Sequence, residues 1–156
     1  MIPIARPILL LLFALAGCGG PPPPPPAVLA LTLSGGADQN PDPAGKPNSV
    51  AIHVYQLTGT GKFDNADVFA LLDKEKATLG DEAAASETVF LAPGATVSIN
   101  EPLKPGVTAL GMVAAFRDID HATWRVKAPV KPSGPTKLEA KTAGIVLTLK
   151  PAAPAP

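Results

Sequence analysis

The chain has 156 residues, of which 46% are hydrophobic, 4% aromatic and 17% charged, and its formal net charge is zero. This length suits one domain with its own hydrophobic core. A near-neutral chain without a basic run argues against nucleic acid as a partner and against electrostatic binding to membranes. The single cysteine excludes a disulfide within the chain, so the core has to form without one.

Residues 1–17 have the composition of a secretory signal peptide. One basic residue, Arg6, precedes the apolar run from Ile8 to Ala16, which is about half of the roughly 20 residues that a membrane-spanning helix needs. The run ends in Leu15-Ala16-Gly17-Cys18, which resembles the lipobox of bacterial lipoproteins at all four positions. The resemblance implies cleavage after Gly17 and acylation of Cys18. We therefore expect a lipid anchor instead of a spanning helix.

Residues 18–26 are interpreted as the lipidated cysteine followed by a stiff stalk. Six consecutive prolines, Pro21 to Pro26, favour polyproline II, which at about 3.1 Å per residue gives a spacer of roughly 19 Å. The alternative is a proline-rich ligand for a partner domain. In enterobacterial lipoproteins an aspartate after the cysteine causes retention at the inner membrane, and Gly19 lacks that signal. By this resemblance we expect the periplasmic face of the outer membrane.

From Ala27 the sequence changes to short runs of β-branched and aliphatic residues separated by turn residues. No proline lies inside these runs, as strands in a hydrogen-bonded sheet require. A series of short strands with few helices predicts a mainly β, two-sheet sandwich over residues 27–150, followed by a disordered tail, 151–156. The eight expected strands are Val28 to Leu33, Val50 to Leu57, Ser86 to Leu91, Ala95 to Asn100, Val107 to Arg117, Thr123 to Lys127, Thr136 to Lys141 and Gly144 to Leu149.

One segment, Asp64 to Ala84, has helical spacing instead. Val68, Leu71 and Leu72 recur at the helical period, and Asn65 is a plausible N-cap. We expect one or two short helices inserted after the second strand to cover one end of the sandwich. Phe63 and Phe69 are then expected to anchor these helices in the core.

The longest connection, Ser34 to Ser49, holds three glycines and three prolines. Loops of this length are often functional or disordered. Asn40-Pro41-Asp42 predicts a tight turn, because proline fixes φ and both flanking side chains can bond the backbone. Recognition of a partner and a purely structural turn both remain open. A calcium loop is not expected, because Pro43 and Ser49 replace the glycine and glutamate that an EF-hand needs.

No arrangement typical of an enzyme is present. Asp118, Asp120 and His121 cluster in an expected turn, where they could bind a metal or bond the backbone, and the second reading is favoured. His53 lies inside an expected strand, and Cys18 is reserved for lipid. We expect no catalytic residue, no metal and no cofactor other than the covalent lipid on Cys18.

Several short motifs in a fixed order resemble the outer-membrane lipoprotein of type VI secretion systems, the TssJ family. The resemblance extends from the lipobox to about Arg125. Its motifs are Asn40-Pro41-Asp42, Val54-Tyr55-Gln56-Leu57, Phe63 with Ala66-Asp67 and Leu71-Leu72, Leu79 with Asp81, Leu91-Ala92-Pro93-Gly94, Leu110 to Asp118, and Asp120 with Trp124 and Arg125.

The resemblance implies an eight-stranded, transthyretin-like sandwich that does no chemistry. It implies a component that binds the periplasmic C-terminal domain of an IcmF-type inner-membrane protein and tethers the secretion complex to the outer membrane. The loop between the first two strands is implicated in that contact. Carried onto this chain, the expected partner-binding residues are Gln39, Asn40, Asp42 and Lys46.

Two other functions remain possible from the sequence. One is a periplasmic lipoprotein whose transthyretin-like domain binds a small molecule or glycan, which would need a concave site with exposed aromatic side chains. The other is a secreted hydrolase or metalloenzyme that uses the Asp118, Asp120 and His121 cluster. For the favoured function, replacing Asn40 and Asp42 is expected to weaken partner binding without lowering the melting temperature by more than a few degrees.

Overall fold

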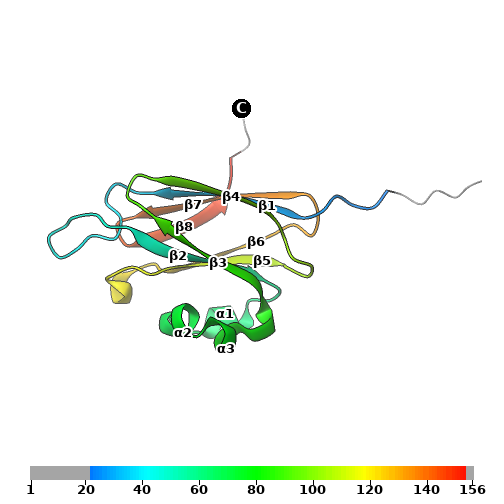
Figure 1. Ribbon diagram of the computed structural model, residues 1–156, viewed down its shortest axis with the longest axis horizontal. Helices are drawn as coiled ribbons and strands as arrows, with labels where there is room; N and C mark the ends of the chain where they lie inside the picture. Colours follow the sequence, from blue (N-terminus) through cyan, green and yellow to red (C-terminus); the bar gives the residue numbers. More distant parts are fainter. Residues whose placement is uncertain (1–21, 154–156) are drawn as a thin grey trace, which may run out of the picture.

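A computed structural model describes residues 22–153, which form two four-stranded sheets packed face to face (Figure 1). One sheet has the order β4-β1-β7-β8 and the other β3-β2-β5-β6. This confirms the expected mainly β sandwich of eight strands. The strands are β1 (Val28–Gly35), β2 (Val50–Leu57), β3 (Ala83–Leu91), β4 (Thr96–Pro102), β5 (Ala109–Ala114), β6 (Arg125–Pro129), β7 (Pro135–Ala143) and β8 (Val146–Pro151).

The core lies between the two sheets and follows from the alternation along each strand. In β1 the side chains of Leu29, Leu31 and Leu33 point inward and are at most 1% exposed, while their neighbours face outward. β1 pairs with β4 in antiparallel and with β7 in parallel register. All six residues of β5 are buried, because one of its faces meets the first sheet and the other meets the helices.

The strands lie where the sequence predicts them, but several begin or end at other residues than expected. β2 has the expected bounds, whereas β5 is shorter at both ends than the expected strand from Val107 to Arg117. The prolines of the strands stand at their ends, as in Pro102, Pro129 and Pro135, where no ladder hydrogen bond from the nitrogen is needed.

The helical insertion follows β2 as expected, but it covers the outer face of the second sheet instead of one end of the sandwich (Figure 1). It comprises α1 (Gly61–Asn65), α2 (Val68–Asp73), α3 (Glu75–Leu79) and the 3-10 turn η1 (Gly80–Glu82). Phe63 is fully buried and lies directly on β5, where a Cβ on Gly111 would stand 2.8 Å from the ring. The glycine therefore permits the close approach of the aromatic ring.

Two further expectations about the insertion are wrong. The N-cap of α2 is Asp67, whose carboxylate accepts a hydrogen bond from the amide of Ala70 at 2.9 Å, while Asn65 ends α1. Phe69 is 61% exposed. With Asp67 as the cap, the inner face of α2 carries Val68 and Leu71, and Phe69 is turned to solvent.

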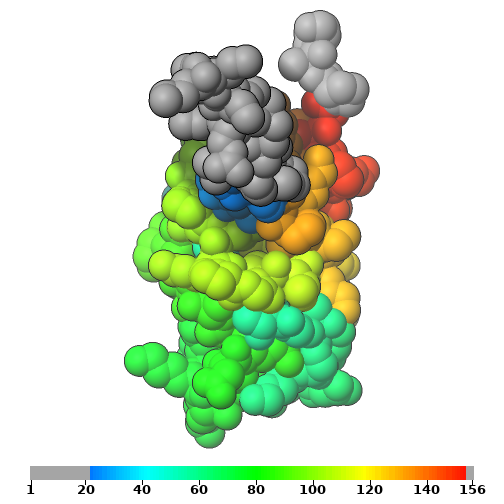
Figure 2. All heavy atoms as spheres, turned by 90° about the vertical axis from the view of Figure 1, so that its right-hand side faces the viewer, coloured from blue at the N-terminus to red at the C-terminus, as the bar shows by residue number. Residues whose placement is uncertain are grey.

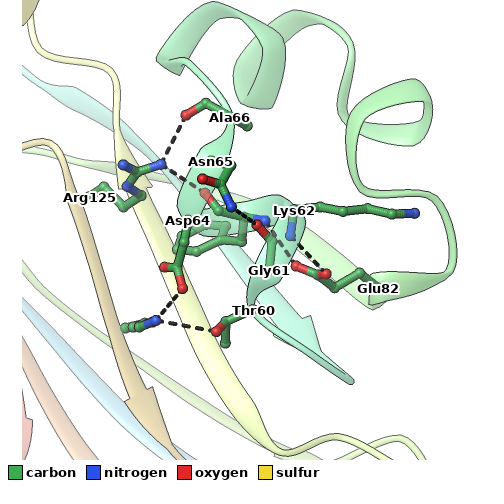
Figure 3. A network of polar contacts seen from close by, with 10 residues as sticks. Thr60, Gly61, Lys62, Asp64, Asn65, Ala66, Glu82 and Arg125 are labelled. Carbon is green, nitrogen blue, oxygen red and sulfur yellow. Dashed lines mark hydrogen bonds and ion pairs between the residues drawn. The ribbon is translucent and has the colours of Figure 1, made fainter.

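Two remote side chains fix α1 at its two ends (Figure 3). The carboxylate of Glu82 accepts hydrogen bonds from the amides of Lys62 and Phe63 at 3.0 and 2.9 Å. The guanidinium of Arg125 on β6 donates to the carbonyls of Phe63 and Ala66 at 2.7 and 2.9 Å. These contacts satisfy polar groups that a short helix leaves unpaired, and they hold the insertion against the sheet.

The chain enters the domain at one end of the sandwich, and the β1–β2 loop extends from the other (Figure 1). We call these the stalk end and the distal end. At the stalk end the amide of Ala152 donates to the carbonyl of Lys137, so ordered structure extends past the expected domain boundary at 150. No helix within residues 22–153 has the length and hydropathy to cross a membrane. The expected signal peptide and Cys18 lie outside the described residues, as do residues 154–156.

Candidate functional site

Three connections meet at the distal end: residues 36–49 between β1 and β2, residues 115–124 between β5 and β6, and the turn between β7 and β8. Between them lies an open hollow of about 530 Å³. Its lining residues are Pro41, Asp42, Pro43, Arg117, Asp118, Gly144 and Ile145. The loop that the sequence singles out is thus one part of a composite surface.

Gln39 holds the base of the β1–β2 loop from inside. Its side chain is fully buried, and its amide nitrogen donates to the carbonyl of Leu91 at 2.6 Å and to that of Asn48 at 3.3 Å. The hydroxyl of the buried Thr142 donates to its amide oxygen. One side chain therefore ties the loop to the ends of β3 and β7, which belong to different sheets.

Asn40 joins the three connections. Its backbone has φ of 47°, a left-handed conformation that asparagine tolerates better than most residues. The backbone amide donates to Gly144 at 2.7 Å, the side-chain nitrogen donates to Ser49 at 2.8 Å, and the side-chain oxygen accepts from the amide of Arg117 at 2.8 Å. Only 7% of Asn40 is exposed. Gln39 and Asn40 thus make their contacts inside the loop, and the three bonds of Asn40 lead us to expect a larger cost in stability from its replacement than the sequence alone suggests.

Asp42 and Lys46 close the exposed tip of the loop. One carboxylate oxygen of Asp42 accepts hydrogen bonds from the amides of Ala44 and Lys46, both at 2.9 Å. The backbone amide of Asp42 donates to the carbonyl of Lys46 at 2.9 Å. The side chain of Lys46 is exposed, and Asp42 belongs to the lining of the hollow. A tight turn is present here, but it begins at Asp42, where the amide of Gly45 donates to the carbonyl of Asp42 at 2.8 Å. It therefore lies two residues after the predicted turn at Asn40-Pro41-Asp42.

Arg117 belongs to the same surface, although sequence reasoning did not select it. Its backbone is bonded to Asn40, and it lines the hollow beside Asp118. In the sequence, only its position at the end of the run Leu110 to Arg117 could have pointed to Arg117. The structure shows that this position lies against the β1–β2 loop. The distal surface thus carries charges of both signs. The anions are Asp42 and Asp118, and the cations are Lys46 and Arg117.

The histidine cluster makes a local contact at this end. Nδ1 of His121 lies 2.7 Å from a carboxylate oxygen of Asp118, and this hydrogen bond raises the pKa of His121. Both side chains are more than half exposed. Residues 22–153 hold no group of three or more His, Cys, Asp or Glu side chains placed to bind a metal ion. The hollow is open and has no aromatic side chain in its lining. Such a surface suits contact with a protein better than capture of a small molecule.

The comparison with protein families identifies the chain. A profile of the family described as "Type VI secretion lipoprotein, VasD, EvfM, TssJ" matches residues 27–150. The chain belongs to this type VI secretion lipoprotein family. None of the curated proteins with which the chain was compared matches it.

Solved structures of this lipoprotein family share the fold. The T6SS lipoprotein TssJ1 from Pseudomonas aeruginosa is 31% identical, with a TM-score of 0.80 over 85% of this chain and 100% of that one. A chain in the structure named "Type VI membrane complex" is 32% identical, with a TM-score of 0.71 over 80% and 98% of the two chains. A chain in "T6SS protein TssM C-terminal domain (869-1107) from EAEC" is 31% identical, with a TM-score of 0.65 over 81% and 99%.

Proposed function

We propose that this type VI secretion lipoprotein is a structural component of the secretion membrane complex and that its distal end binds the periplasmic C-terminal domain of an IcmF-type inner-membrane protein. Support comes from the relatives found in a type VI membrane complex and in a structure named for the TssM C-terminal domain. In this role the protein does no chemistry and needs no cofactor.

The second part of the proposal is the anchor. Cys18 carries the lipid, and the acyl chains hold the protein at the periplasmic face of the outer membrane. Membership of a lipoprotein family supports a membrane anchor, and Gly19 favours the outer membrane. Bound at both ends, the protein tethers the inner-membrane component to the outer membrane.

The single observation that favours this arrangement is the opposition of the two ends. The chain enters at Pro22 on the stalk side, and the composite surface of loops lies at the other end of strands that are five to nine residues long (Figure 1). At about 3.3 Å per residue these strands separate the ends by roughly 15–30 Å. A domain attached to lipid at one end thus presents its loops away from the membrane.

The test is calorimetric titration of residues 22–153 against the partner's periplasmic C-terminal domain. Ala44 is exposed at the loop tip and its side chain makes no polar contact, so Ala44→Trp adds bulk without removing the bonds of Asp42. We expect this variant to weaken binding at least about tenfold, an effect typical of a disturbed interface centre. The same change at the exposed Ala77 on α3 is the matched control and should leave affinity unchanged. If both variants bind like the parent chain, the contact is not at the distal end.

The anchor is tested in the full-length chain by Cys18→Ser. We expect this variant to lose labelling by palmitate and to leave the outer-membrane fraction, while binding of the soluble partner persists. Labelling and retention that survive the substitution would show that Cys18 is not the site of acylation.

A further inference from the structure

The stalk end has a surface that the proposed partner contact does not use. Residues 22–27 run between two turns and are bonded to both: the amide of Gly134 donates to Pro25 at 3.2 Å, and the amide of Leu103 donates to Ala27 at 3.0 Å. Figure 2 looks onto this end and shows the entering chain between the β4–β5 connection and the β6–β7 connection. The path of the chain is therefore fixed where it meets the domain.

Four exposed lysines surround this entry point, and we call them the basic rim. Three of them directly precede a proline at the end of a strand or in a turn, a position that favours extended backbone. Within residues 22–153 the ion pairs of the structure involve none of the four. The basic rim consists of Lys104, Lys131, Lys137 and Lys150.

Acidic side chains offset the basic rim only in part. Glu139 is exposed on β7, and Glu101 is half-buried and accepts a hydrogen bond from the side chain of Gln56 at 2.6 Å. The distal end has the opposite balance, with Asp38, Asp42, Asp118 and Asp120 against Lys46 and Arg117. Charge is therefore distributed unevenly along the domain, with an excess of positive charge at the stalk end and of negative charge at the distal end.

Apolar hollows lie among the rim lysines. One of about 410 Å³ is lined by Lys104, Leu103 and several prolines, and another of about 500 Å³ by Lys131, Lys137 and further prolines. Lysine stems can lie along such apolar surface while the ammonium groups reach outward. A surface of this kind matches the boundary between lipid headgroups and acyl chains.

We propose that the basic rim binds the phosphate groups of an anionic phospholipid surface. The proposal rests on the anchor at Cys18, which lies four residues before Pro22. The residues between them are Gly19, Gly20 and Pro21. Fully extended, this short tether reaches at most roughly 14 Å, less than twice the Debye length of about 8 Å at physiological ionic strength. The lipid that holds the chain therefore keeps the rim within electrostatic reach of the headgroups, and each lysine strengthens binding several-fold.

The experiment compares the mature chain from residue 18 in acylated form and as the unacylated Cys18→Ser variant. Sedimentation is measured with vesicles of pure phosphatidylcholine and of equimolar phosphatidylcholine and phosphatidylglycerol. We expect the unacylated chain to bind only the anionic vesicles, and more weakly as salt is raised. Lys104→Gln, Lys131→Gln and Lys137→Gln together should reduce this binding at least about tenfold.

The matched control neutralises three exposed lysines elsewhere, Lys74→Gln, Lys76→Gln and Lys141→Gln, and should keep at least half of the binding. Equal loss in both triple variants would overturn the proposal, because net charge alone would then explain it. The proposal would also be overturned if the unacylated chain did not bind the anionic vesicles. In that case the rim faces a protein or solvent. Failure of the acylated chain to bind pure phosphatidylcholine would instead contradict the anchor at Cys18 and leave the rim to be judged from the unacylated chain.

Discussion

At the residue scale, two buried amide side chains decide the shape of the distal loop. Gln39 and Asn40 use their donors and acceptors on backbone groups of three other segments, which a loop without regular secondary structure could not otherwise satisfy. Local chemistry predicts a tight turn in this loop, but places it at Asn40 instead of Asp42, where the structure has it. It cannot predict that Gln39 points inward, because Leu91 and Thr142 stand 52 and 103 residues away in the chain.

Gln39→Ala should destabilise the domain strongly for a loop substitution. The change leaves the carbonyl of Leu91 and the hydroxyl of Thr142 without their partner and opens a void, so we expect a loss of about 2–4 kcal/mol in the free energy of unfolding. Urea unfolding measures the effect. Ala44→Ser at the exposed tip of the same loop serves as the control and should change stability by less than about 0.5 kcal/mol. A small loss for Gln39→Ala would mean that the loop holds its shape by other contacts.

Tyr55 gives the domain a pH dependence that can be observed directly, since it is the only tyrosine of the chain. It is fully buried and donates to the carbonyl of Leu71 at 2.9 Å, and burial raises its pKa well above the usual value. A raised pKa in the folded state stabilises the fold fully below the unfolded pKa of about 10, and this contribution is lost as pH rises above it.

We therefore expect the phenolate absorbance to appear together with alkaline unfolding and not before it. Tyr55→Phe should lose about 1 kcal/mol at neutral pH, because the carbonyl of Leu71 loses its donor, and should show a shallower fall in stability above pH of about 10. Parallel absorbance and circular dichroism titrations measure both. A phenolate signal from folded protein would contradict the burial of the hydroxyl.

At the element scale, the sequence determines the strands better than the helices. Runs of β-branched and aliphatic residues between turn residues, together with the exclusion of proline, locate all eight strands, including β5, which is buried on both faces. The insertion is harder to predict because its three helices have only five or six residues each. Helices this short are not stable by propensity, and tertiary contacts set their ends. The sequence therefore gives the wrong cap at Asn65 and the wrong environment for Phe69.

Glu82→Gln tests whether such contacts hold α1 in place. The carboxylate bonds the amides of Lys62 and Phe63 and offers negative charge to the start of the helix, whereas the amide of glutamine keeps one acceptor and no charge. We expect a loss of about 1 kcal/mol for Glu82→Gln and more for Glu82→Ala.

Hydrogen exchange should show the loss as faster exchange of the amides of Lys62 and Phe63, with the strands protected as before. Glu87→Gln on β3 is the control, because its carboxylate makes no contact with α1. Equal effects of the two substitutions on α1 would assign the change to net charge.

At the scale of the whole molecule, the order of the strands places two functions at opposite ends. β1 and β7 run in parallel from the stalk end, so the loops that follow them both lie at the distal end. The sequence identifies the anchor, the sandwich and one loop. It does not show that residues 115–124 and the β7–β8 turn join that loop, because register between distant strands decides this.

The domain boundaries at 27 and 150 follow from composition, and the structure indicates that a chain cut there loses stability. Beyond them Pro25 accepts from Gly134, and the amide of Ala152 donates to Lys137 at 3.0 Å. Two hydrogen bonds at about 1 kcal/mol each, together with the end of β8, predict that residues 27–150 melt roughly 4 °C or more below residues 22–153.

Chains 22–150 and 27–153 separate the two contributions. Gly134 and Lys137 stand three residues apart at the start of β7, so the two losses are neighbours and are not expected to add strictly. All four chains should bind the partner equally, since the cuts are at the stalk end and the proposed contact is at the distal end. Equal melting temperatures would show that the bonds of Pro25 and Ala152 contribute nothing to the fold. A loss of partner binding without a loss of stability would place part of the interface at the stalk end.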